Sequence, residues 1–96
     1  MQAEGIGHRV GSAFEAVFPE GRAVLEYERS GRCMAIVHTH VPEELRGRGL
    51  AGRLVRAALD HARAEGLVVE PQCSYAADWL ARHPEYADLV ADRPQE

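Results

Sequence analysis

The chain has 96 residues, 46% of them hydrophobic and 27% charged, and a formal net charge of −4. This length predicts one small domain over residues 1–96, with enough apolar residues for one sheet and two helices. The negative charge argues against nucleic acid as the main partner, and the absence of a long apolar run argues against a signal peptide or a membrane contact. Two cysteines and scattered histidines without ligand spacing indicate a cytoplasmic protein with reduced thiols and no metal site.

The first half of the chain predicts an antiparallel meander. Three segments rich in apolar and β-branched residues are separated by short turns containing glycine, and they cover residues 13–18, 22–29 and 32–41. A short edge strand over residues 6–10 is predicted as well. Strict alternation in the third strand would place His38 and His40 on the same face as Met34 and Ile36.

The second half changes to a helical period and then returns to a strand. Residues 50–65 carry apolar side chains at helical spacing, namely Ala51, Leu54, Val55, Ala58 and Ala62. Residues 67–70 form a short strand that should run parallel to 32–41 through a right-handed crossover. A helix over 75–82 and a turn near 85–90 follow. The expected fold is a mixed α/β (α+β) sheet: an antiparallel β-meander, a β-α-β crossover and a C-terminal helix.

The segment before the long helix predicts a phosphate site. Residues 47–52, Gly-Arg-Gly-Leu-Ala-Gly, can present successive backbone N–H groups at a helix N-terminus, where the helix dipole adds partial positive charge. All eleven basic residues are arginines, and five of them fall between positions 46 and 63: Arg46, Arg48, Arg53, Arg56 and Arg63. This basic island fits a polyanionic small ligand; a solvated helix face is the alternative for the last three.

One interpretation of the glycines is a dinucleotide-binding fold. Gly47, Gly49 and Gly52 fit G-x-G-x-x-G, and Glu70 follows at the end of the next strand. Against this, Pro42 and the residues after it separate the glycines from the preceding strand. Antiparallel hairpins precede the motif, and only one strand follows it.

The other interpretation is a family resemblance. Residues 46–51, Arg-Gly-Arg-Gly-Leu-Ala, resemble the Q/R-x-x-G-x-G/A motif of the GNAT superfamily of N-acetyltransferases, and residues 8 to 90 resemble a minimal, YjdJ-type group within it. The resemblance implies that coenzyme A, as acetyl-CoA, binds between strands 32–41 and 67–70 and that an acetyl group passes to an unknown acceptor. The implied cofactor contacts are Val41, Arg46, Gly47, Arg48, Gly49, Leu50, Ala51, Gly52 and Tyr75, with Arg82, His83 and Tyr86 toward the adenine or 3′-phosphate end.

Two residues are candidates for the chemistry. Cys73 follows strand 67–70, where the resemblance implies the thioester end of the cofactor, and a nearby helix start could favour its thiolate. His38 has an intrinsic pKa suited to a general base. Transfer to an amine or thiol acceptor could be direct or pass through acetyl-Cys73; a non-catalytic CoA-binding module is the alternative. A second copy, in a homodimer, could complete the acceptor cleft.

Overall fold

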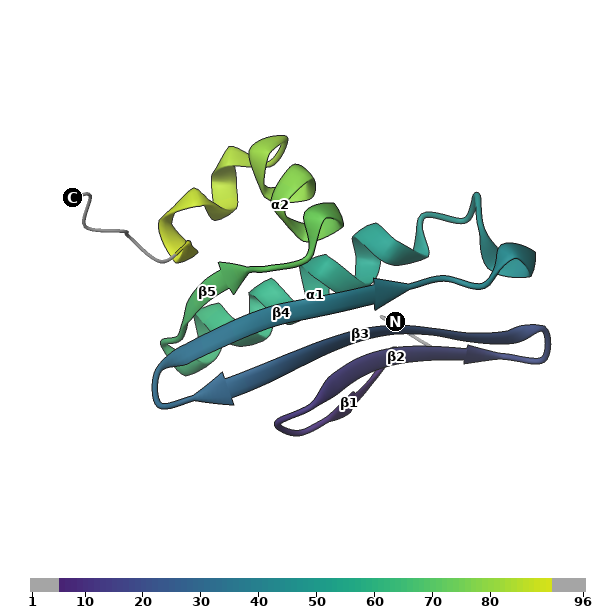
Figure 1. Cartoon of the computed structure of the whole chain (residues 1–96), viewed down its shortest axis with the longest axis horizontal. Helices are drawn as coiled ribbons and strands as arrows, with labels where there is room; N and C mark the ends of the chain where they lie inside the picture. The colour runs from purple at the N-terminus through teal and green to yellow at the C-terminus, as the bar shows by residue number, and fades with distance from the viewer. Residues whose placement is uncertain (1–5, 91–96) are drawn as a thin grey trace.

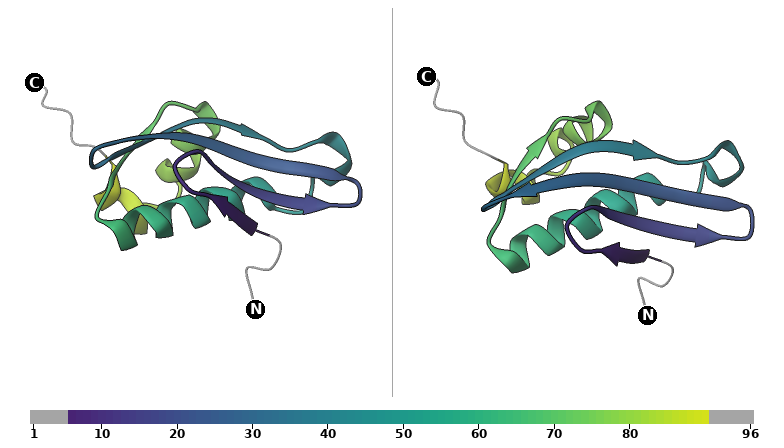
Figure 2. Two further views of the ribbon diagram at one scale, coloured as in Figure 1. Left: turned by 90° about the horizontal axis from the view of Figure 1, so that it is seen from below. Right: turned by 60° about the horizontal axis from the view of Figure 1, so that its bottom comes forward.

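The structure, a computed structural model, describes residues 6–90. Its elements in chain order are β1 (Ile6–Arg9), β2 (Ala13–Phe18), β3 (Gly21–Ser30), β4 (Cys33–His40), η1 (Glu43–Leu45), α1 (Leu50–Glu65), β5 (Val68–Pro71), α2 (Ser74–Ala81) and η2 (Pro84–Leu89), where η marks a 3₁₀ helix. The five strands form one sheet in the order β1-β2-β3-β4-β5, and only β4 and β5 run parallel. The long helix α1 crosses one face of this sheet (Figures 1 and 2).

This architecture confirms the predicted mixed sheet. The meander, the crossover through α1 and the C-terminal helix all lie where the sequence patterns put them, with the ends of each predicted element shifted by one residue or less. The residues that separate β4 from the glycines include the short 3₁₀ helix η1. The sheet order also excludes the dinucleotide-binding fold, because that fold needs further parallel strands around the glycine motif. Among residues 6–90, no helix is long and apolar enough to cross a membrane.

The core lies between the sheet and α1. In β3, Ala23, Leu25 and Tyr27 are at most 3% exposed, as the alternation predicted. From α1, the buried side chains are Leu50, Leu54, Val55, Ala58, Leu59 and Ala62. Ala51, expected in this set, is only half-buried. The helix ends at Gly66, whose φ of 71° is the left-handed geometry that lets its amide reach the carbonyls of Ala62 and Arg63.

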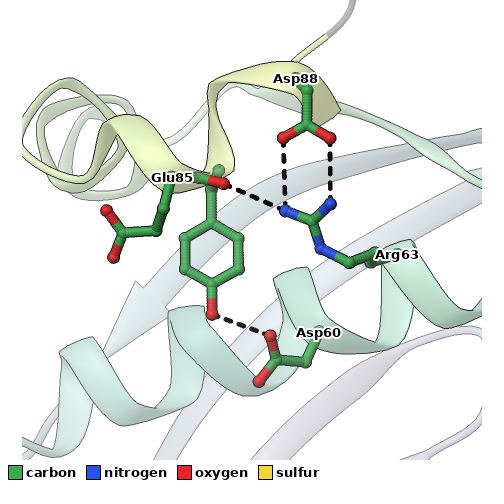
Figure 3. A network of polar contacts seen from close by, with 5 residues as sticks. Asp60, Arg63, Glu85 and Asp88 are labelled. Carbon is green, nitrogen blue, oxygen red and sulfur yellow. Dashed lines mark hydrogen bonds and ion pairs between the residues drawn. The ribbon is translucent and has the colours of Figure 1, made fainter.

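The helix α2 and the 3₁₀ helix η2 are fastened to the far side of α1 by aromatic and polar contacts. Trp79 of α2 is 5% exposed and stacks on His83, with ring centroids 3.6 Å apart. Arg63 of α1 donates paired hydrogen bonds to Asp88, at 3.0 and 3.3 Å, and a third to the carbonyl of Glu85 (Figure 3). The Arg63 contacts hold η2 beside the last turn of α1, although the two elements are separated in sequence by β5 and α2.

A bulge in β4 decides which face its last residues occupy. Tyr27 pairs with Ile36 but Glu26 pairs with His38, so β4 has one extra residue, Val37, against β3. Because paired residues share a face, His38 lies with the exposed Glu26 and not with the buried Ile36. The prediction that His38 and His40 share a face with Met34 and Ile36 is therefore wrong. An extra residue shifts the alternation by one position, and nothing in the local sequence pattern marked it.

The edge strand β1 is attached through a histidine. His8 stacks on Phe14, with centroids 4.1 Å apart and planes within 5°, and its Nε2 lies 2.5 Å from the Tyr27 hydroxyl oxygen. His61 of α1 meets the His8 ring edge-on, with centroids 4.5 Å apart. The pKa of His8 is lowered, first by burial of the ring and then by repulsion from His61. The fold therefore favours the neutral imidazole.

We expect the protein to lose stability when the pH falls below about 6.5, the ordinary histidine value. Below that value the unfolded chain binds a proton at His8 more readily than the folded chain, so the free energy of unfolding falls as the pH drops toward the lowered native pKa. Above pH 6.5 the contribution of neutral His8 to stability is fully present. Thermal unfolding between pH 5 and 8 measures this. His8→Phe keeps an aromatic ring on Phe14 but has no titrating group, so the melting temperature of this variant should depend less on pH below 6.5. Parallel melting curves against pH for the two proteins would contradict the assignment to His8.

Candidate functional site

The loop that leads into α1 owes its shape to two glycines. Gly47 and Gly49 have φ values of 85° and 73°, which side chains with a Cβ rarely adopt. Before them, the Arg46 Nε donates to the carbonyl of Val41 at 3.1 Å and closes the loop around η1. Gly49 is then the N-cap of α1 and offers no side chain to cap it. The chain therefore turns sharply and leaves its backbone bare at the start of the helix.

This bare backbone contains a run of unpaired donors. Within residues 6–90, the amides of residues 47–52 have no hydrogen-bond partner, and the first helical bond is made by the Arg53 amide to the Gly49 carbonyl at 3.1 Å. The first turn of α1 also has no acidic residue. Six successive donors thus lie at the positive end of a 16-residue helix, the kind of helix terminus at which phosphate binds in other proteins.

A cavity of about 190 Å³ opens over these amides. It is lined by Val41, Leu45, Arg46, Gly47, Gly49, Leu50, Ala51, Gly52 and Tyr75. All but one of these residues were predicted as cofactor contacts. Leu45 was not, because it lies in η1 and is fully buried, and the sequence around it is acidic. The structure thus brings the glycine loop, the end of β4 and the start of α2 together around one hollow.

Four of the implied contacts do not line this cavity: Arg48, Arg82, His83 and Tyr86. The Arg48 side chain turns to the β2–β3 hairpin, 3.6 Å from a Glu20 oxygen and over the Phe18 ring, so only its backbone belongs to the loop. Arg82 is exposed at the end of α2. His83 stacks on Trp79 and its Nδ1 lies 2.7 Å from the Trp79 carbonyl oxygen. Neither Arg82 nor His83 lines the cavity, because both follow the last residue of α2, whereas the α2 residue on the cavity wall, Tyr75, lies in its first turn.

Gly52 has a different role from the other loop glycines. A Cβ at this position would lie 3.1 Å from the indole nitrogen of Trp79 and 3.6 Å from the Tyr75 hydroxyl oxygen. Gly52 therefore lets α2 pack closely on the first turn of α1, which in turn places Tyr75 on the cavity wall. Its spacing in the sequence suggested a phosphate-loop glycine, whereas the close approach of two helices is what requires it.

The strands β4 and β5 separate before β4 reaches Val41 and the chain after β5 reaches Tyr75, two residues of the cavity wall. Their pairing ends at Ile36 and Pro71, and the amides of Gln72 and Cys73 both donate to the Ile36 carbonyl at 3.0 Å. Beyond that point β5 leads away into α2 (Figure 1). The bulge at Val37 begins at the same place, so the β4 residues after it have no partner from β5. An elongated ligand can lie in the gap between diverging strands.

Cys73 sits where the strands part. Its Sγ lies 3.6 Å from the Oγ1 of Thr39, and the side chain is half-buried. Partial burial alone would raise the pKa of the thiol, but the net shift is downward, because the amide of Ala76, the Thr39 hydroxyl and the amide of Tyr75 stabilise the thiolate. The cysteine is also the N-cap residue of α2, so the helix dipole acts in the same direction. These features favour a nucleophilic sulfur.

The residue that faces Cys73 from β4 is Thr39, which the sequence reasoning missed. Thr39 pairs with the buried Leu25 across the bulge, so its side chain is on the α1 side of the sheet. His38, the predicted base, is exposed on the opposite face, with its ring 6.2 Å from that of His40. The sequence could have predicted that Thr39 faces Cys73 only if the extra residue at Val37 had been known.

The fold and the site define a class: an antiparallel meander, a splayed parallel pair and a bare helix N-terminus are the architecture of the GNAT-type acetyltransferases. The chain belongs to the GCN5-related N-acetyl-transferase family, whose model matches residues 13–89. It also matches the NMR solution structure of a GCN5-like protein from Staphylococcus aureus, with a TM-score of 0.75 and 26% identity over 100% of this chain and 96% of that one. The resemblance inferred from the sequence is thereby confirmed.

Curated relatives carry the name protein NATD1. The Homo sapiens protein is 42% identical over 64 residues, which are 66% of this chain and 57% of that one. The Danio rerio protein is 36% identical over 72 residues, which are 72% of this chain and 66% of that one. The match therefore spans less than two thirds of either relative.

Proposed function

We propose that this protein binds acetyl-CoA at the start of α1 and transfers the acetyl group to an amine or thiol acceptor. The observation that carries the proposal is the run of six unpaired amides at residues 47–52, which opens onto a cavity with Val41 and Tyr75 in its wall. Thr39 and Cys73 each stand two residues before a cavity-wall residue, Val41 and Tyr75 respectively. A diphosphate at the amides would thus place the thiol end of the cofactor near Cys73.

The residues present fit this cofactor. The loop amides would hold its diphosphate, while Val41 and Tyr75 would flank its pantetheine arm. When bound, acetyl-CoA supplies an acyl group activated as a thioester. The Cys73 thiolate, favoured by Thr39 and by the first turn of α2, can form a bond to the acetyl carbon as the bond to the cofactor sulfur breaks. That exchange replaces one thioester by another and returns a thiolate, which takes up a proton.

We place the binding of the acceptor on the face of β4 opposite Thr39. Because His38 is exposed on the face opposite Thr39, it is not placed to deprotonate Cys73. We assign it instead to an acceptor that approaches through the gap between β4 and β5 from the open side, where a neutral imidazole can take the proton of an ammonium group. A second copy of the chain could supply the rest of that acceptor cleft.

A CoA-binding module without catalysis is the second candidate. The exposed position of His38 favours it, because its imidazole lies on the open face of the sheet with Glu26, which is exposed as well. In this alternative the loop and cavity are used in the same way, and acetyl-CoA remains intact on the protein. Tight binding without transfer to any member of a panel of amines and thiols would select this alternative.

Calorimetric titration tests the binding step on which both candidates depend. We expect CoA and acetyl-CoA to bind saturably at one site per chain, and NAD, which has a diphosphate but no pantetheine arm, to bind much more weakly. Incubation of the saturated complex with the amine and thiol panel, followed by mass spectrometry of the products, then measures transfer. Saturation by NAD with no heat from CoA would overturn the proposal.

A further inference from the structure

The edge strand β1 joins the core through one side chain. It has four residues and is the terminal strand of the sheet described for residues 6–90, so it pairs with β2 on one side only (Figure 2). Its residues are half-buried or exposed, and none belongs to the buried core. His8 reaches three other elements, because its ring contacts Phe14 of β2, Tyr27 of β3 and His61 of α1. The attachment of β1 therefore depends on this imidazole.

The hydrogen bonds around Tyr27 are all satisfied only when the Nε2 of His8 carries no proton. The backbone amide of Gly11 donates to the Tyr27 hydroxyl oxygen at 2.9 Å, so the single proton of that hydroxyl is left for Nε2. A protonated imidazole would have to donate from Nε2 instead, and the hydroxyl proton would lose this acceptor. Tyr27 is only 3% exposed, and a buried donor without a partner is costly.

The charges near His8 also oppose its protonation. His61 lies edge-on to it, with ring centroids 4.5 Å apart, and repels a positive charge there. The nearest carboxylate on β2, that of Glu15, is 3.3 Å from both Arg9 and Arg22. Burial and His61 together lower the pKa of His8, and no carboxylate of residues 6–90 offsets them.

The strand β1 also closes a second hollow, of about 170 Å³, between itself and α1. Its lining consists of Ile6, Arg53, Arg56, Ala57 and Asp60. The Asp60 carboxylate accepts a hydrogen bond from the Tyr86 hydroxyl at 2.8 Å, and it contributes nothing to the pKa shift of His8. This acidic residue of α1 is thus held by η2 and does not pair with the imidazole.

We propose that His8 makes β1 an acid-released edge strand: when the imidazole takes up a proton, β1 separates from β2 and α1 while the other four strands and α1 stay folded. Release exposes the ring of Phe14 and the outer edge of β2, and it removes Ile6 from the second hollow. The rest can stay folded because the buried core lies in the other elements. This inference does not rest on the proposed function.

Hydrogen exchange of the backbone amides, followed by NMR on the full chain between pH 7.5 and 5, tests this. A released His8 regains the ordinary pKa of about 6.5, so acid favours the released form below that pH. Once corrected for intrinsic exchange, the protection of the β1 amides and of Gly11 should fall by about tenfold for each pH unit between 6.5 and the lowered native value. The amides that pair β3 with β4 should keep their protection.

Three variants assign the effect. In His8→Phe, which keeps a ring on Phe14 without a titrating group, the protection of β1 should no longer depend on pH. His61→Gln removes the repelling imidazole but none of the contacts of β1 with Phe14 and Tyr27, so the fall in protection should be smaller than in the wild-type chain. His40→Gln is the matched control, because His40 is exposed on the opposite face of the sheet, and it should behave as the wild-type chain does.

Protection of β1 that stays constant with pH in the wild-type chain would overturn the inference, because nothing is then released. A fall shared equally by β3 and β4 would also overturn it, since the whole protein would then be unfolding. The same holds for a wild-type fall in His8→Phe. If that variant leaves β1 unprotected at every pH, His61→Gln decides, and a fall as large as in the His40→Gln control would overturn the inference.

Discussion

After incubation with acetyl-CoA, intact-mass spectrometry should show the wild-type chain carrying one acetyl group and the Cys73→Ala variant carrying none. The reason is the environment of Cys73: its thiol has a lowered pKa, stands at the point where β4 and β5 part, and faces the Thr39 hydroxyl at 3.6 Å. A thiolate at the thioester end of the cofactor can accept the acetyl group without a large change in free energy, because one thioester replaces another. The variant removes the only nucleophile that we place there.

Two further variants sharpen this result. Cys33→Ala is the matched control, since Cys33 is a half-buried thiol at the other end of β4 and should not affect labelling. Thr39→Val removes a hydroxyl that stabilises the thiolate, so the pKa of Cys73 should rise and labelling at neutral pH should slow by about threefold to tenfold, recovering at higher pH. Acetylation that persists in Cys73→Ala would contradict the covalent route. Turnover without any acetyl-protein would point to direct transfer.

Gly49→Val should weaken CoA binding by about 100-fold. Gly49 has a φ of 73°, a conformation that a β-branched residue does not adopt, so the substitution rotates the loop and disperses its amides. Loss of one or two charge-assisted hydrogen bonds, each about 1.5–3 kcal/mol, accounts for a change of this size. Because a Cβ at Gly49 meets no atom within 4 Å, the effect on the rest of the fold should be small. Calorimetry with CoA measures the affinity.

Gly31→Val provides the control for backbone strain. Gly31 has a φ of 58° in the β3–β4 turn, also with open space around its Cβ position, but it lies far along the strand from the cavity. The melting temperature should fall by a similar amount in both variants, because each substitution introduces about 1–2 kcal/mol of backbone strain. Only Gly49→Val should lose CoA. Gly52 is unsuitable for this test because a side chain there would collide with Trp79. Equal CoA affinity in the two variants would move the ligand away from the loop.

The arrangement of α2 and η2 shows how binding and stability share residues in a small protein. Trp79 packs over Gly52 at the phosphate loop and also lies against Arg56 at the second hollow. Tyr86 links Arg56 to Asp60, and its own pKa is raised, first by burial and then by the carboxylate of Asp60. It therefore remains a neutral hydrogen-bonding group across the physiological range. The close packing of α2 on Gly52 therefore also places Tyr75 on the cavity wall.

The sequence by itself determined the order of the elements and the position of the glycine loop before α1. Alternation in β3, the helical period of α1 and the glycines at 47 and 49 are local patterns whose meaning depends on backbone geometry within a few residues. Local patterns also predicted the position of Cys73, two residues after the strand that ends the crossover. Most of the cavity lining was predictable for this reason.

Only the tertiary structure decided how these parts meet. One extra residue at Val37 exchanged the faces of His38 and Thr39, and it became visible only through the register with β3. The pairing of Thr39 with Cys73 spans 34 residues, and that of Arg56 with Tyr86 spans 30. Such contacts depend on strand register and on the close crossing of two helices at Gly52, which are set by packing across the whole molecule and leave no mark in any short stretch of sequence.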